Sequence, residues 1–183
     1  IKNVNVAVIL GNSKTYHKNN IYSLTTNLSD FIWKRSAVNK NKVTDFSILD
    51  NKNIVYNKKF LNKNSLSFDE TRIDNFNGAA EDSDFGIKIG SYKGIALYND
   101  SQIIEHKDPT NLSGYLKKII HVSKVDKNYE NSVCYKLGDS RSFSKSLSLF
   151  VKYTNSFSLI GKLKIVSLKM ITIIISKFIK YAY

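Results

Sequence analysis

The sequence has few of the residues that build disulfide or thiolate-metal scaffolds. A single cysteine, Cys134, among 183 residues excludes both an internal disulfide and a zinc site made of four cysteines. The only methionine is Met170 and the chain begins at Ile1, so we expect a processed chain or a piece of a longer protein. Its start also lacks the basic, apolar and small-residue order of a signal peptide.

Acidic residues are missing from one end of the chain. The net charge is +13, from 28 Lys and Arg against 15 Asp and Glu. Residues 140–183 carry a net +8 with no acidic residue, residues 1–63 carry another +8, and residues 64–139 carry −3. Such an excess predicts an anionic partner, while the ordinary 42% of hydrophobic residues excludes a fully disordered chain.

Strand and helix patterns alternate along the chain, which predicts an α/β fold. We expect the apolar run 4–11 to be a buried strand closed by a turn at Gly11, and residues 12–50 to be loop with one short helix. The remaining predicted elements are a strand leading into a helix at 53–61, a helix at 81–91 capped by Gly94, strands at 95–98 and 102–106 around a turn at Asn99-Asp100, and an amphipathic helix at 113–122.

Three carboxylates fall within four residues at Glu81, Asp82 and Asp84, at the start of a predicted helix. Two interpretations are open. Carboxylates at a helix start are stabilised by the unpaired N–H groups and the helix dipole, which makes simple capping sufficient, and Asp84 suits that role. Crowded carboxylates also repel one another, and one pKa then rises toward the range useful for proton abstraction.

The order of motifs around this cluster resembles the second half of a family 2 glycosyltransferase with the GT-A fold, a Rossmann-like α/β domain. The match covers roughly residues 50–120. Its pieces are Phe68-Asp69-Glu70, then Gly78-Ala79-Ala80-Glu81-Asp82-Ser83-Asp84-Phe85, then Gly94, then Glu105-His106, and finally Tyr115-Leu116-Lys117-Lys118.

The resemblance implies a role for each of four residues. Asp82 would be the base that deprotonates an acceptor hydroxyl, so that transfer inverts the sugar, and Glu81 and Asn53 would bind the acceptor. His106 would join a divalent metal site, Mg or Mn, although a hydrogen-bonded His at a strand end is an open alternative. The main metal ligands, an Asp-x-Asp in the family's nucleotide-binding first half, have no counterpart here.

We therefore expect residues 1–125 to be the acceptor side of a GT-A domain, and residues 126–183 to be a basic, apolar tail of C-terminal helices. Such an enzyme would transfer a sugar from a nucleotide-sugar donor to a glycan or lipid-linked acceptor, in cell-surface polysaccharide synthesis. A chain without the donor half would be catalytically incomplete.

The tail has two open interpretations. On a helix, Lys162, Lys169, Lys177 and Lys180 fall within roughly 80° of one another, and most of the remaining circumference is apolar. Its longest uncharged run, 170–176, is too short to span a bilayer. The tail would lie peripherally on an anionic membrane surface, on the cytoplasmic side, or pack its apolar face on the domain; a strand at 171–175 is a further alternative.

Two rival functions follow from the same residues. A non-enzymatic basic module would bind an anionic membrane or nucleic acid through the +13 charge, but the sequence contains no recognisable nucleic-acid motif, so we expect no nucleic-acid partner. A hydrolase would need a nucleophile with its base, and no Ser/His/Asp or Cys/His set can be assembled around the acidic cluster.

Overall fold

A mixed five-stranded open sheet forms the centre of the computed structural model, which describes residues 5–70, 81–130 and 143–182. The strand order is β2-β3-β5-β1-β4. The long strands β1 (Val6–Thr15) and β5 (Ile95–His106) run parallel, while β4 (Ile54–Tyr56) pairs antiparallel with β1. On the other side of β5 lie the short strands β3 (Lys42–Val43) and β2 (Val38–Asn39).

Two sequence predictions about these strands are wrong for a common reason. β1 continues through Gly11 without a turn, and β5 is one strand without a break at Asn99-Asp100. The two strands pair along both halves, but the register shifts: Gly11 faces Asn99 and Asn12 faces Ile103. Residues 100–102 of β5 therefore have no partner in β1, and a bulge accommodates the residues whose composition suggested a turn.

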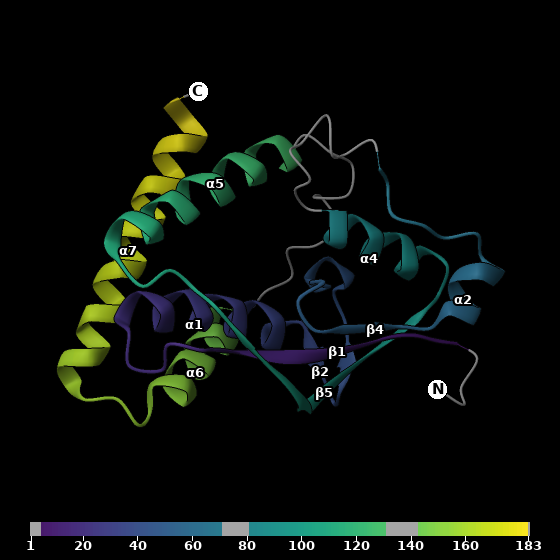
Figure 1. The fold of residues 1–183 in the computed structure, drawn as a ribbon, viewed down its shortest axis with the longest axis horizontal. Coiled ribbons are helices and arrows are strands. Elements are labelled where there is room, and N and C mark those ends of the chain that lie inside the picture. Colours follow the sequence, from purple (N-terminus) through teal and green to yellow (C-terminus); the bar gives the residue numbers. More distant parts are fainter. Residues whose placement is uncertain (1–4, 71–80, 131–142, 183) are drawn as a thin grey trace.

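The helices that surround this sheet gather in two groups in Figure 1, with α2 and α4 at one end of the molecule and the other four at the opposite end. Their bounds are α1 (Ile21–Ser36), α2 (Lys58–Lys63), α4 (Glu81–Ser91), α5 (Leu112–Glu130), α6 (Phe143–Thr154) and α7 (Leu159–Ala182), with a 3₁₀ turn η1 at Phe46–Ile48.

The predicted helix at 81–91 and the predicted strand-then-helix at 53–61 are confirmed by α4, β4 and α2. α1 is much longer than the short helix expected in this region. It begins at Ile21, directly after the cap residue Asn20, whose side chain accepts hydrogen bonds from the N–H groups of Tyr22 and Ser23. The domain boundary placed after residue 125 falls within α5. The C-terminal residues 159–182 form a helix, so the strand alternative at 171–175 is wrong.

The core lies between the sheet and α4, and the end of α4 explains part of its packing. Lys93, with φ at 57°, takes the left-handed position of a Schellman cap, so the predicted cap at Gly94 is one residue late. A Cβ on Gly94 would lie within 2.9 Å of Ala7 and Phe60, so this glycine allows α4 and β1 to approach closely. The buried cluster includes Val8, Leu10, Ile48, Leu49, Phe60, Phe85, Ile89 and Tyr98.

Some predicted features fall outside the described residues, namely Gly78, Ala79, Ala80 and Cys134. Of the helices that the structure describes, none combines the length and the apolar character needed to cross a membrane.

Candidate functional site

The first turn of α4 presents the acidic cluster. Asp82 Oδ2 accepts a hydrogen bond from the backbone N–H of Asn51 at 3.3 Å, and Asp82 Oδ1 accepts one from the N–H of Ser83 at 2.8 Å. Glu81 is half-buried beside it. Asp84 is buried and its Oδ2 lies 3.8 Å from Nζ of Lys88, one turn later. The carboxylates benefit from the free N–H groups and the dipole of the helix, and Asp82 also reaches across to another segment.

The segment that Asp82 reaches is fixed against α4 by η1. Ser83 Oγ donates a hydrogen bond to the carbonyl of Ser47 at 2.7 Å. One turn further on, a Cβ on Gly86 would lie only 2.1 Å from the carbonyl oxygen of Phe46, so only glycine permits this approach. The loop that follows η1 carries Asp50 and Asn51. The contact between α4 and η1 therefore determines where this loop faces Asp82.

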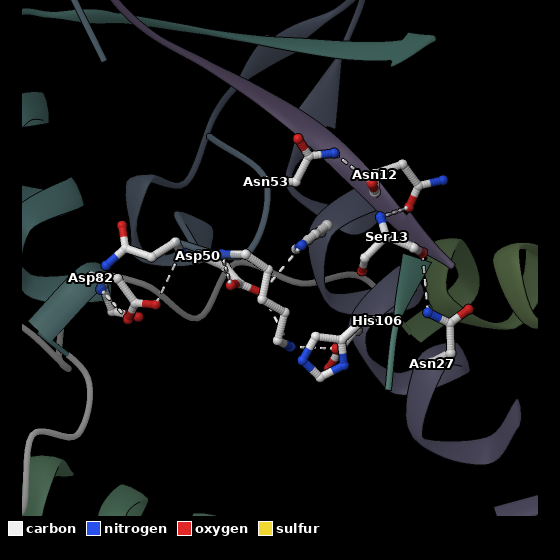
Figure 2. Close-up of polar contacts among 12 residues, drawn as sticks. Asn12, Ser13, Asn27, Asp50, Asn53, Asp82 and His106 are labelled. Carbon is white, nitrogen blue, oxygen red and sulfur yellow. Dashed lines mark hydrogen bonds and ion pairs between the residues drawn. The ribbon is translucent and has the colours of Figure 1, made fainter. Parts of the chain in front are cut away.

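Asp50 belongs to a buried cluster of opposite charges. Lys34 of α1, whose side chain is 1% exposed, places Nζ 3.2 Å from Asp50 Oδ2. Nζ of Lys52 lies 3.3 Å from the same oxygen and 2.7 Å from Oδ2 of Asp30. The backbone N–H of Lys52 donates to Asp50 Oδ1 at 2.8 Å. Two ammonium groups thus surround one carboxylate directly beside the loop that contacts Asp82 (Figure 2).

Asp50 and Asp82 are driven in opposite directions by these surroundings. Burial alone would raise the pKa of Asp50, but the charges of Lys34 and Lys52 outweigh it, and the pKa lies below its ordinary value. Burial raises the pKa of Asp82, the Glu81 charge raises it further, and the two backbone hydrogen bonds offset this only in part. Two carboxyl groups with pKa values pushed apart have different chemical roles: Asp50 is a fixed anion, and Asp82 has the greater affinity for a proton.

Tyr56 and Asn51 join this site, and sequence reasoning missed both. The Tyr56 hydroxyl donates to Asn51 Oδ1 at 2.8 Å. Burial, followed by the charges of Asp82, Asp50 and Glu81, raises the pKa of Tyr56, which keeps the phenol protonated and able to donate. The sequence does place the polar pair Asp50-Asn51 directly before the predicted strand at 53–61. Only the fold shows that this loop faces α4.

The Phe68-Asp69-Glu70 segment also reaches this region through its aromatic ring. Phe68 stacks against Phe85 of α4 with ring centroids 4.1 Å apart, and Phe85 in turn lies 5.5 Å from the ring of Tyr56 on β4. Three segments that the sequence analysis selected are thus brought together within one aromatic cluster beside Asp82.

Asn53 has a different environment from the one the resemblance implied. Its side chain is buried, and Nδ2 donates to the carbonyl oxygens of Asn12 at 2.7 Å and Gln102 at 2.9 Å. Oδ1 accepts from Nε2 of Gln102 at 2.8 Å. These hydrogen bonds join β1 to the bulge of β5 and leave the amide committed within the protein. Figure 2 shows the one between Asn53 and Asn12. Asn53 is therefore a residue that holds the sheet together, and we do not include it among the acceptor contacts.

His106 lies at the end of β5, and the structure gives no contact between it and Asp82. Its Nδ1 is 3.3 Å from Oδ1 of Asp108, an oxygen that also lies 3.4 Å from Nζ of Lys118. An ammonium group against this carboxylate disfavours a divalent cation there. Across the described parts of the chain, no three His, Cys, Asp or Glu residues gather as metal ligands. These surroundings fit the hydrogen-bonded strand-end histidine and do not fit a metal at His106.

Comparisons with protein-family models, with curated proteins and with solved structures find no match to this chain. The structure establishes an α/β fold with a mixed open sheet.

Proposed function

We propose that this chain is the acceptor-binding part of an inverting glycosyltransferase with the GT-A fold, and that Asp82 is its catalytic base. One observation carries the proposal: a carboxylate with a raised pKa is fixed at a helix N-terminus, beside a second carboxylate that two lysines hold as an anion. The order of motifs supports the same reaction, since the Phe68 segment, β4 and α4 meet in the aromatic cluster around Phe85, one turn along α4 from this carboxylate.

The proposed reaction is a single displacement. Asp82 removes the proton from an acceptor hydroxyl while the hydroxyl oxygen forms a bond to the anomeric carbon of the donor sugar. The bond from that carbon to the nucleoside diphosphate breaks on the opposite side, so the configuration inverts. A carboxylate whose pKa is raised by burial and by Glu81 is a stronger base than an exposed one, and general-base catalysis of this kind contributes roughly 10²–10⁴-fold.

The neighbours of Asp82 have positioning roles in this scheme. The N–H of Asn51 orients the carboxylate, and Tyr56 orients Asn51 through its side-chain amide. Glu81 is half-buried at the same helix start, where its carboxylate is suited to accept hydrogen bonds from acceptor hydroxyls. No step is assigned to a metal, because the described residues do not fit one.

The donor side would join the sheet along β4. In the described residues, β4 pairs with β1 on one side only, and Val55 in its middle is 48% exposed. An edge strand with unpaired backbone groups is suited to receive another strand. In the proposed enzyme, the strands that bind the nucleotide sugar would continue the sheet there and place the donor near the start of α4.

Acceptor binding tests the assignment on the chain itself. Oligosaccharides and lipid-linked sugars would be screened against it by saturation-transfer NMR. Bound acceptors are expected to lose affinity in Glu81→Gln and Tyr56→Phe, while Asp100→Asn, a change of an exposed carboxylate at the β5 bulge, leaves affinity unchanged. If acceptors bind but all three variants retain full affinity, the acceptor site lies elsewhere and the assignment fails.

A further inference from the structure

The outward side of α7 is largely apolar, which differs from what a helix on a protein surface in water normally shows. Among the side chains of α7 that the structure describes, Ile165 and Ile179 are the buried apolar ones, and Leu168 and Ile175 are half-buried. Polar side chains share the inward face with them and lie against α1 and α5. The residues concerned are Lys169, Thr172 and Ser176, which line a cavity of about 170 Å³ beneath the helix.

Hydrogen bonds fix this orientation at three successive turns. Lys169 Nζ donates to Ser29 Oγ of α1. The hydroxyls of Thr172 and Tyr115 lie 2.7 Å apart, and so do those of Ser176 and Ser123 on α5. Burial also lowers the pKa of Lys169, with Asp30 opposing the effect in part. A helix with this inward polar pattern cannot turn its apolar side inward without losing these contacts.

The outward face of α7 is consequently apolar and exposed. Leu159 is 73% exposed, Ile174 63% and Phe178 67%. Helical geometry places the exposed apolar residues within about half of the circumference, so they form one continuous strip. The strip consists of Leu159, Ile160, Leu163, Val166, Met170, Ile171, Ile173, Ile174, Phe178 and Tyr181. A contiguous apolar surface of this length marks an interaction site.

The charge around the strip selects its partner. Lys164 and Lys177 are exposed on the same helix, and residues 140–183 contain no acidic side chain, so the charges that α7 itself carries are all positive. Helical geometry places Lys164 at the border of the strip and Lys177 within it. Exposed Ile, Leu and Phe together with such lysines are suited to lie in the plane of an anionic lipid surface. The helix itself lies at the end of the molecule opposite α4 in Figure 1 and forms its edge.

We infer that the outward strip of α7 binds the surface of an anionic membrane, with the helix lying flat in the interface. The pattern of charge along the sequence suggested a lysine face toward lipid, whereas the structure turns Lys169 inward and leaves the apolar strip exposed. This inference stands apart from the proposed transfer reaction, since it depends on α7 and not on Asp82.

The test is sedimentation of the whole chain with vesicles of phosphatidylcholine alone and with 30% phosphatidylglycerol added. We expect binding to the anionic vesicles, and an at least tenfold loss of partitioning in Ile174→Glu/Phe178→Glu. Val55→Glu, which alters an exposed apolar residue on β4, is the control and should bind as the unaltered chain does. Lys164→Gln and Lys177→Gln should each weaken the anionic preference about fivefold.

Two further measurements check that the variant is folded and locate the contact with the membrane. Circular dichroism checks that the double variant remains folded. A fluorophore on Ile174→Cys, in a Cys134→Ser background, should become shielded from an aqueous quencher when vesicles are added, and one on Val55→Cys should not. Equal partitioning of the double variant and the control would overturn the inference. Concentration-dependent dimerisation that the double variant abolishes, without vesicle binding, would instead assign the strip to a second copy of the chain.

Discussion

Lys34 provides the sharpest test of how the site is held, because its ammonium group is almost completely buried beside Asp50. Replacing it in Lys34→Met leaves an apolar chain of similar length and removes one of the two positive charges that offset the carboxylate. Breaking a buried ion pair from one side costs about 3–5 kcal/mol. Lys52 remains 3.3 Å from the same oxygen, so we expect the lower end, about 3 kcal/mol of unfolding free energy.

The control is Lys18→Met, the same change at a lysine whose ion pair with Glu105 is exposed on both sides. Exposed pairs contribute about 1 kcal/mol or less, so the two variants should differ severalfold in urea denaturation. Adding Asp50→Asn to Lys34→Met removes the uncompensated charge and should restore part of the loss. Equal costs for the two lysines, or a double variant that loses the sum of the single losses, would refute the reasoning.

The pH dependence of this effect has a definite sign. The pKa of Asp50 is lower in the folded chain than in the unfolded one, so its contribution is present above the unfolded value near 4 and is lost as the pH falls through the folded value. Acid should therefore destabilise the unaltered chain more steeply than Lys34→Met, and the gap between their unfolding free energies should narrow below about pH 4.

Three further predictions concern α4 and stability. Gly86→Ala should destabilise the chain by about 2 kcal/mol or more in urea denaturation, because the added Cβ meets the carbonyl of Phe46, whereas Gly161→Ala, which meets nothing closer than 3.4 Å, should be neutral or stabilising. Lys93→Gly should raise the melting temperature slightly, since it relieves a left-handed residue at a cost of about 1 kcal/mol. Asp82→Asn should raise the free energy of unfolding at neutral pH. The pKa of Asp82 is higher in the folded chain than in the unfolded one, so ionisation of this carboxyl above about pH 4 destabilises the native state. At lower pH the carboxyl is protonated in both states, and the gain from the variant should vanish.

Local pattern predicted the elements whose signals are contained in a few residues. The signals for α4, an acidic first turn and an end, lie within a short stretch. For β4 and α2, a strand pattern is followed by Asn57, which caps the start of α2. The division of β5 failed because Asn99-Asp100 is turn-forming in isolation, while pairing with β1 on both sides of the bulge holds the strand together. Tertiary hydrogen bonding outweighed local propensity there.

The candidate site divides in the same way. Asp82 and Glu81 stand together in the sequence and could be selected from it, but Asn51 and Tyr56 join them only because η1 packs against Gly86. Charge counting had a similar limit. Part of the excess in residues 1–63 belongs to Lys34 and Lys52, which are used inside the fold to hold Asp50, so net charge overstated the surface left for an anionic partner.

The most direct test of the central claim is the transfer rate of Asp82→Asn in a protein or complex that joins this chain to a donor-binding domain. With donor and acceptor saturating, we predict a fall of roughly 10²–10⁴-fold, because the variant lacks the base, while donor and acceptor affinities change by only a few fold. Turnover within tenfold of the unaltered enzyme would contradict the assignment of Asp82 as the catalytic base.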